Sequence, residues 1–363
     1  MRVNYSDLDI AKLLMAFLVV EIHARPLMEF PLAERIIEGI DVVAVPFFFM
    51  ASAFLCFRGL DEVSFVEKTL PGAVRVRKTI GRLLKLYLIW TVLYLPVTVF
   101  GSVIHGDGLA YALAVFARGT LLIGENYYSW PLWYLLASAV GFALVYICLR
   151  GGVRSRYIIL LSFALLSVGF VIAFVQGWED APAALSIPVK IYGTVFGGSR
   201  NGIFEGFFYV AMGAFFGMSF RDFEKAPVWA EVMLVVFGLS GTILVSNDAH
   251  LPFCITASTG LFLLSIRRCG ANLKPHEWAR NTSTIVYLVH MYFIVLFVYG
   301  IYGGTNADLY ANGVDGPLLY LFALGSSALF SALVIVSSKR MPFLRKVLAS
   351  SGILVSKSSK TGF

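Results

Sequence analysis

The sequence predicts an all-α integral membrane protein with about ten transmembrane helices and both termini in the cytoplasm. Of its 363 residues, 58% are hydrophobic and 14% charged, and the mean hydropathy is +0.79. A soluble domain of this size needs more charge to cover its surface, so the composition favours a chain solvated by lipid. The apolar residues form continuous runs of about 20, the length that crosses a bilayer core of about 30 Å. Continuous runs indicate helices, whereas barrel strands would alternate.

Each of the apolar runs is expected to form one span. The ten runs cover residues 8–24, 41–58, 84–104, 131–149, 156–176, 203–220, 228–246, 251–267, 283–302 and 317–337. Two further apolar stretches, 109–124 and 183–196, are shorter, and each contains a basic residue. We expect these two stretches to be interfacial helices or packed outer loops.

Basic residues lie mainly on one side of the predicted membrane. With the N-terminus in the cytoplasm, most of the 29 Lys and Arg residues fall in cytoplasmic loops or near the chain ends, as the positive-inside rule requires. Topology therefore accounts for the formal charge of +7, and nucleic-acid binding is not expected. Residues 1–338 are predicted to form one membrane domain, and residues 339–363 a short, basic, flexible cytoplasmic tail.

The cysteines do not indicate a metal site. Cys56, Cys148, Cys254 and Cys269 lie in or beside apolar runs without the spacing of a zinc site or a disulfide framework. We therefore expect neither a bound metal nor a structural disulfide.

The first predicted helix carries two ionisable residues on one face. Lys12 and His23 are eleven positions apart, so their side chains project from the same side, separated by about 16 Å along the axis. Ionisable residues inside a span usually face protein or water, which makes them functional candidates. In the simpler alternative, Lys12 extends to the cytoplasmic headgroups and His23 merely ends the helix.

A basic segment leads into the third predicted span. Its cations are Arg75, Arg77, Lys78, Arg82 and Lys85, and the last three share one helical face. Arg and Lys are the usual ligands of phosphate groups such as those of coenzyme A. The alternative is that this cytoplasmic loop binds anionic lipid.

Two other ionisable groups belong to later spans. His290 lies about seven residues into the ninth, where it would contact a substrate or form an interhelical hydrogen bond. Glu205 begins the sixth span beside Arg200. It would line an outer cavity or, more simply, form an ion pair with Arg200.

Five motifs resemble, in order, those of the acyltransferase-3 family of membrane O-acyltransferases. Lys12 and His23 match the R/K-X10-H signature of its first helix. The segment AVPFFFMASAFL (residues 44–55) is similar to its VPxFFxxSGFxL stretch, with Ser52 at the serine position. The basic segment VRVRKTIGRLLKLYLIW (74–90) is similar to the family's Arg-rich third helix. The segment PLWYLLA (131–137), which includes Trp133, is similar to its LWFL segment, and STIVYLVH (283–290) is similar to its sxxIYLxH segment.

The resemblance implies a reaction and a location. An acyl group, expected to be acetyl, would be transferred from acyl-CoA to a hydroxyl of a cell-surface glycan or its precursor. Acyl-CoA would be a co-substrate and not a bound cofactor. The enzyme would be multi-pass in a bacterial plasma membrane, in contact with membrane lipid. The alternative is a transporter or flippase for a sugar or amphiphilic substrate, against which stands the absence of an internal repeat.

The resemblance also implies roles for individual residues. His23 would be the general base, because imidazole titrates near working pH. Lys12 would contact the CoA or stabilise developing charge. The further candidate residues are Ser52, Trp133, Glu205 and His290, and the CoA-binding candidates are Arg75, Arg77, Lys78, Arg82 and Lys85.

Overall fold

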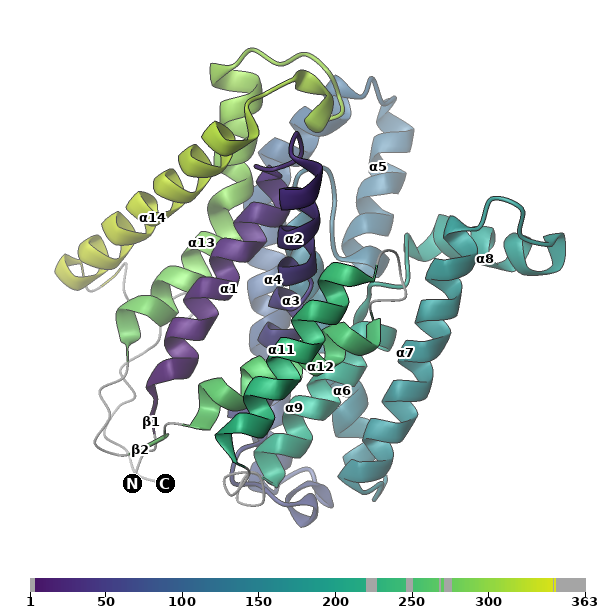
Figure 1. Cartoon of the computed structure of the whole chain (residues 1–363), viewed down its shortest axis with the longest axis vertical. Coiled ribbons are helices and arrows are strands. Elements are labelled where there is room, and N and C mark those ends of the chain that lie inside the picture. The colour runs from purple at the N-terminus through teal and green to yellow at the C-terminus, as the bar shows by residue number, and fades with distance from the viewer. Residues whose placement is uncertain are drawn as a thin grey trace.

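The described residues form helices joined by short loops, together with one pair of two-residue strands (Figure 1). The computed structural model describes residues 4–219, 227–245, 251–267, 269–270, 276–341 and 343. The helices are α1 Ser6–Ala24, α2 Pro31–Asp41, α3 Ala44–Phe57, α4 Pro71–Ile104, α5 Leu109–Arg118, α6 Trp133–Arg150, α7 Ser155–Gly177, α8 Ala183–Phe196, α9 Phe207–Met218, α11 Val228–Leu244, α12 Leu251–Arg267, α13 Glu277–Val295 and α14 Gly316–Arg340. The strands are β1 Asn4–Tyr5 and β2 Cys269–Gly270.

Six helical segments in the described part of the chain are long and apolar enough to cross a membrane. They are Pro31–Phe57, Pro71–Ile104, Trp130–Arg150, Ser155–Gly177, Glu277–Ile301 and Gly316–Arg340. Each predicted apolar run falls on helix wherever it is described, so the all-helical prediction is confirmed, and the fold fits a multi-pass membrane protein. The number of ten spans and the cytoplasmic position of both termini stay predictions.

The structure adds helix where the sequence analysis expected loops. Residues 31–41 form α2, which begins with Pro31, a residue preorganised for the first turn. Pro71 likewise begins α4, whose 34 residues include the whole basic segment and extend about 51 Å. The stretches 109–124 and 183–196 contain α5 and α8. Most of the predicted tail, residues 342 and 344–363, lies outside the described residues.

Helix α1 packs against α3, α13 and α14. It runs in the same direction as α13, because Asp9 interacts with Arg280 near the start of both helices while His23 stacks on His290 further along. At that starting end, β1 pairs antiparallel with β2, Asn4 opposite Gly270 and Tyr5 opposite Cys269. Helix α1 is therefore anchored at its beginning to the segment that follows α12.

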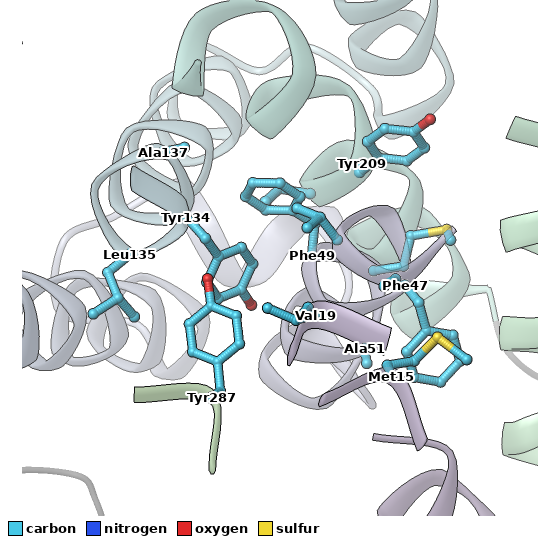
Figure 2. Packing of buried hydrophobic residues seen from close by; sticks show 14 of the residues in the cluster. Met15, Val19, Phe47, Phe49, Ala51, Tyr134, Leu135, Ala137, Tyr209 and Tyr287 are labelled. Carbon is cyan, nitrogen blue, oxygen red and sulfur yellow. The ribbon is translucent and has the colours of Figure 1, made fainter. Parts of the chain in front are cut away.

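Aromatic rings join α3, α6 and α13 (Figure 2). The ring of Tyr134 lies 4.7 Å from that of Phe49 and 5.7 Å from that of Tyr287, centroid to centroid. Such pairs contribute about 0.5–1.5 kcal/mol each beyond the area they bury. Tyr287 also donates a hydrogen bond to the carbonyl of Pro131 at 2.6 Å. These contacts hold α13 against the start of α6, next to the histidines described below.

Glycine allows α9 to approach α3 backbone to backbone. A Cβ added at Gly213 would collide with the carbonyl oxygen of Met50 and lie 2.8 Å from the Cβ of Ala53. In lipid, helices associate through such close packing because there is no hydrophobic gain between them.

We predict that Gly213→Ala separates α3 from α9 and lowers the free energy of unfolding by about 1–3 kcal/mol. The measurement is the thermal unfolding of the purified protein in detergent. The control is Gly325→Ala in α14, where a Cβ meets nothing within 4 Å and the melting temperature should stay unchanged or rise. Equal melting temperatures for the two variants would show that the close approach is unimportant.

Candidate active site

A cavity of about 650 Å³ lies beside the C-terminal end of α1. Side chains of α1, α2, α3 and α11 line it, together with Arg200 and Tyr310. Its wall includes four carboxyl side chains and three arginines among apolar residues. A cavity of this volume and polarity is large enough for a small polar ligand.

His23 is half-buried in the wall of this cavity. Its ring stacks on that of His290, with centroids 5.3 Å apart and planes inclined by 21°, and lies 5.6 Å from the ring of Trp130. Its backbone carbonyl accepts a hydrogen bond from Tyr310 Oη at 3.4 Å. The imidazole is therefore fixed by aromatic contacts while its residue borders the cavity.

His290 is fully buried directly behind His23. Its Nδ1 lies 3.1 Å from the carbonyl oxygen of Val286 in the same helix, and its Nε2 has no partner in the described part of the chain. Among the described residues His290 therefore forms no interhelical hydrogen bond, and its ring contacts α1 by stacking on His23. A proton on Nδ1 that bonds to Val286 leaves Nε2 as an acceptor.

A group of charges surrounds Lys12 near the start of α1. Lys12 interacts electrostatically with Asp9, Arg280 and Arg82. Asp9 is 6% exposed, and the Nε of Arg280 is buried without a hydrogen-bond partner among the described residues. Three cations around one carboxylate leave a net positive charge, which attracts anions.

The structure distributes the basic residues of α4 between two roles. Arg82 interacts with Lys12 and so belongs to this charge group. The Nη1 of Arg75 donates hydrogen bonds to the carbonyl oxygens of Cys56 and Arg58, at 3.2 and 2.9 Å, and thereby caps the end of α3. The remaining members, Arg77, Lys78 and Lys85, are exposed along α4.

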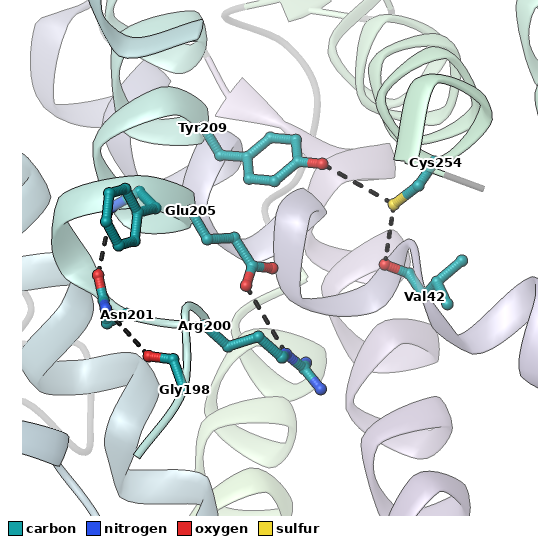
Figure 3. Close-up of polar contacts among 8 residues, drawn as sticks. Val42, Gly198, Arg200, Asn201, Glu205, Tyr209 and Cys254 are labelled. Atoms are coloured by element: carbon teal, nitrogen blue, oxygen red, sulfur yellow. Dashed lines mark hydrogen bonds and ion pairs between the residues drawn. The ribbon is translucent and has the colours of Figure 1, made fainter. Parts of the chain in front are cut away.

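Arg200 connects the cavity to two other candidate residues. Its Nε lies 3.7 Å from Glu205 Oε2, so the ion pair anticipated from the sequence is formed (Figure 3). Its guanidinium lies over the ring of Trp133, 5.3 Å from the centroid. Asn201 fixes this segment, because its Oδ1 accepts hydrogen bonds from two backbone N–H groups of the following π-helical turn, Gly202–Gly206.

Ser52 lies in the aromatic core and not in the cavity wall. Its Oγ is 3.1 Å from Tyr134 Oη, a contact that joins α3 to α6. The described residues include no group of three His, Cys, Asp or Glu side chains placed to hold a metal ion. The thiols of Cys56, Cys148 and Cys254 are free.

Sequence reasoning missed two residues that the structure brings to these groups. Arg280 precedes His290 by ten positions, almost the spacing of Lys12 and His23, and that parallel could have identified it. Glu125 lies in the loop before α6 and interacts electrostatically with Arg200. Burial raises the pKa of Glu125 to about 7. No sequence pattern marks Glu125, because its environment is made by tertiary packing.

A helical fold with six long apolar helices among the described residues, and with ionisable groups in its interior, fits a multi-pass membrane protein. The chain belongs to the acyltransferase-3 family, since a family model described as an acyltransferase domain matches residues 5–336. Membership supports an acyl-transfer activity.

Two curated relatives carry racemase names. The chain is 25% identical to an amino-acid racemase of Enterococcus faecalis over 224 residues. This match covers 61% of this chain and 29% of the relative. It is 27% identical over 264 residues to a serine/alanine racemase of Enterococcus gallinarum, covering 71% of this chain and 35% of the relative. The chain thus spans about a third of the length of these relatives. No solved structure shows a significant match.

We predict that Glu125→Gln stabilises the protein at high pH. A carboxyl whose pKa is raised from 4.5 to about 7 in the folded state lowers stability as the pH rises from about 4.5 to 7, since the folded state retains the proton. At pH 8 the variant should be more stable than wild type, by up to about 3 kcal/mol. At pH 5 the difference should nearly vanish. Thermal unfolding of both proteins at pH 5 and pH 8 measures the difference in stability. A gain in stability of the variant that is equal at the two pH values would contradict the raised pKa of Glu125.

Proposed function

We propose that the protein transfers an acyl group, acetyl in the first instance, from acyl-CoA to a hydroxyl of a cell-surface glycan or its precursor, in a bacterial plasma membrane. The observation that carries this proposal is the position of His23. His23 borders a cavity lined by charged residues, its ring stacks on that of His290, and the same helix carries Lys12 in a cluster of cations. Family membership supports the reaction type.

His23 is the general base in this proposal. Its neutral imidazole takes the proton of the acceptor hydroxyl while the oxygen attacks the thioester carbonyl. A C–O bond forms, the C–S bond breaks, and the proton passes from His23 to the departing CoA thiolate. The products are the ester and free CoA, with no net proton gained or lost. Arg200, in the same cavity wall, is a cation available to developing negative charge.

The charge group around Lys12 is the proposed site for the phosphates of CoA. Lys12, Arg82 and Arg280 carry three positive charges against Asp9, and guanidinium groups bind phosphate through paired hydrogen bonds. This group and His23 are separated by about 16 Å along α1. An extended pantetheine arm would follow α1 and α13 from the phosphates to the cavity. Donor and acceptor would then approach the reacting centre from opposite ends of one helix.

We predict that His23→Gln lowers kcat by about 100-fold or more, since general-base catalysis contributes about 10²–10⁴, with little change in KM for acetyl-CoA. The assay follows CoA release by the purified protein with a panel of glycan acceptors. The matched control is His105→Gln. His105 stacks on Tyr127 and does not line the cavity, so this variant should keep wild-type activity. A folded His23→Gln enzyme with more than half of the wild-type kcat would exclude His23 as the base.

We predict that Arg280→Ala and Arg82→Ala each raise KM for acetyl-CoA by about tenfold, the loss of one charge-assisted contact, while kcat changes much less. Arg154→Ala, which removes an exposed arginine before α7, should leave KM unaltered. Unchanged KM in both test variants would move the donor site elsewhere. If wild type neither binds nor consumes acyl-CoA with any acceptor, the enzyme assignment falls and transport is the function to test.

A further inference from the structure

Two carboxyl groups lie together in the cavity wall, and one of them belongs to Glu21, two residues before His23 in α1. Glu21 of α1 is 6% exposed and Asp41, at the end of α2, is 5% exposed. A side-chain hydrogen bond joins them. Two carboxyl groups form a hydrogen bond only when one of them carries a proton. If the two carboxyl groups share one proton, one negative charge remains on the pair in a buried position.

The pair has little cationic compensation. The charged groups that act on Asp41 are Glu21, Glu34 and Glu38, all of them carboxyls. Arg25 acts on Glu21, but it is the partner of Glu34 and Glu38. The three arginines of the cavity have other partners. Arg25 lies 3.2 Å from Glu34 and 3.6 Å from Glu38, and Arg200 lies 3.7 Å from Glu205. Arg35 donates hydrogen bonds to the carbonyl oxygens of Ile243 and Leu244, both at 2.9 Å.

One carboxyl oxygen of Asp41 has no hydrogen-bond donor in the described part of the chain. This atom, Oδ1, is buried. Buried polar groups in proteins are nearly always paired. Ionisable groups inside membrane proteins are rare because burying them costs free energy, and those that are present usually have a function. Because Asp41 borders the cavity, the missing partner is one that a ligand would supply.

The chemistry of the pair selects among ligand groups. An ammonium group offers three donors and a positive charge, and so satisfies both carboxylates after their shared proton leaves. A hydroxyl offers one donor and no charge. An anionic group would be repelled by the neighbouring carboxyls of α2.

We propose that the acceptor is an amino sugar whose primary ammonium group binds Glu21 and Asp41 while a hydroxyl of the same sugar reaches His23. This inference rests on the proposed function, because the hydroxyl is the group that is acylated. The bound ammonium keeps its proton and is therefore not a nucleophile. The product is an ester and not an amide, with the C–O bond formed at the hydroxyl.

Binding to the purified full chain in detergent tests the ammonium preference directly. The probes are glucosamine, glucose and N-acetylglucosamine, which share the ring and differ in the group at one carbon. By calorimetry, glucosamine should bind at least about tenfold more tightly than the other two, the scale of a charge-assisted hydrogen bond. Asp41→Asn, nearly isosteric, should abolish this preference.

Two further variants complete the binding test. Glu21→Gln should act like Asp41→Asn, and it replaces that variant if Asp41→Asn fails to fold. Glu29→Gln removes an exposed carboxylate that does not line this cavity and should retain the full preference. Equal binding of the three sugars by wild type, or an undiminished preference in both test variants, would overturn the inference.

Acetyl transfer separates this inference from the proposed function. With acetyl-CoA, glucosamine should be the better acceptor, and its acetyl group should be released by mild base as an ester. Equal transfer to glucose and glucosamine would overturn the ammonium inference and leave the acyltransferase proposal standing. Selective binding of glucosamine without transfer to any sugar would instead overturn the proposed function and leave the cavity's ligand class intact.

Discussion

The parallel packing of α1 against α13 is the constraint on which the candidate site depends. Each helix carries a charged residue near its start and a histidine about three turns later, Lys12 and His23 on one, Arg280 and His290 on the other. Because the two helices run side by side in the same direction, the charged residues interact near one end and the rings stack at the other. An antiparallel pair would place each histidine beside the other helix's cation. The separation of a basic end from a histidine end thus follows from helix direction.

The surrounding helices keep this arrangement rigid by different means. Small residues let α9 approach α3 closely, and rings from α3, α6 and α13 interlock beside the histidines. Lipid supplies no hydrophobic gain between helices, so dense packing and internal hydrogen bonds must supply the specificity. A polar cavity inside such a bundle is then stable only where its charged groups have partners, as Arg200 does in Glu205. Within the described residues, Asp41 Oδ1 is buried without a donor, and the ammonium ligand proposed above would supply one.

Helical periodicity predicted the parts of the site that lie on one helix, and tertiary packing decided the rest. Lys12 and His23 could be placed on one face from their spacing alone, because that geometry is local. The stacking of His23 on His290 joins residues far apart in the chain, so helical spacing could not predict it. Glu125 comes from a loop, and Asp41 from a short helix that the apolar runs did not reveal. The basic segment lies at the start of α4, and no pattern within it indicates that Arg75 would cap α3.

The length of α4 makes the protein sensitive to its surroundings. The helix extends about 51 Å, roughly 20 Å more than the hydrocarbon core of a bilayer. Its first turns, with the exposed Arg77 and Lys78, would therefore stand at the depth of lipid phosphates. Anionic headgroups and a nucleotide-bearing donor would compete there for the same cations. Turnover in a living membrane would then depend on the local share of acidic lipid and on ionic strength, a dependence that measurements in neutral detergent would miss.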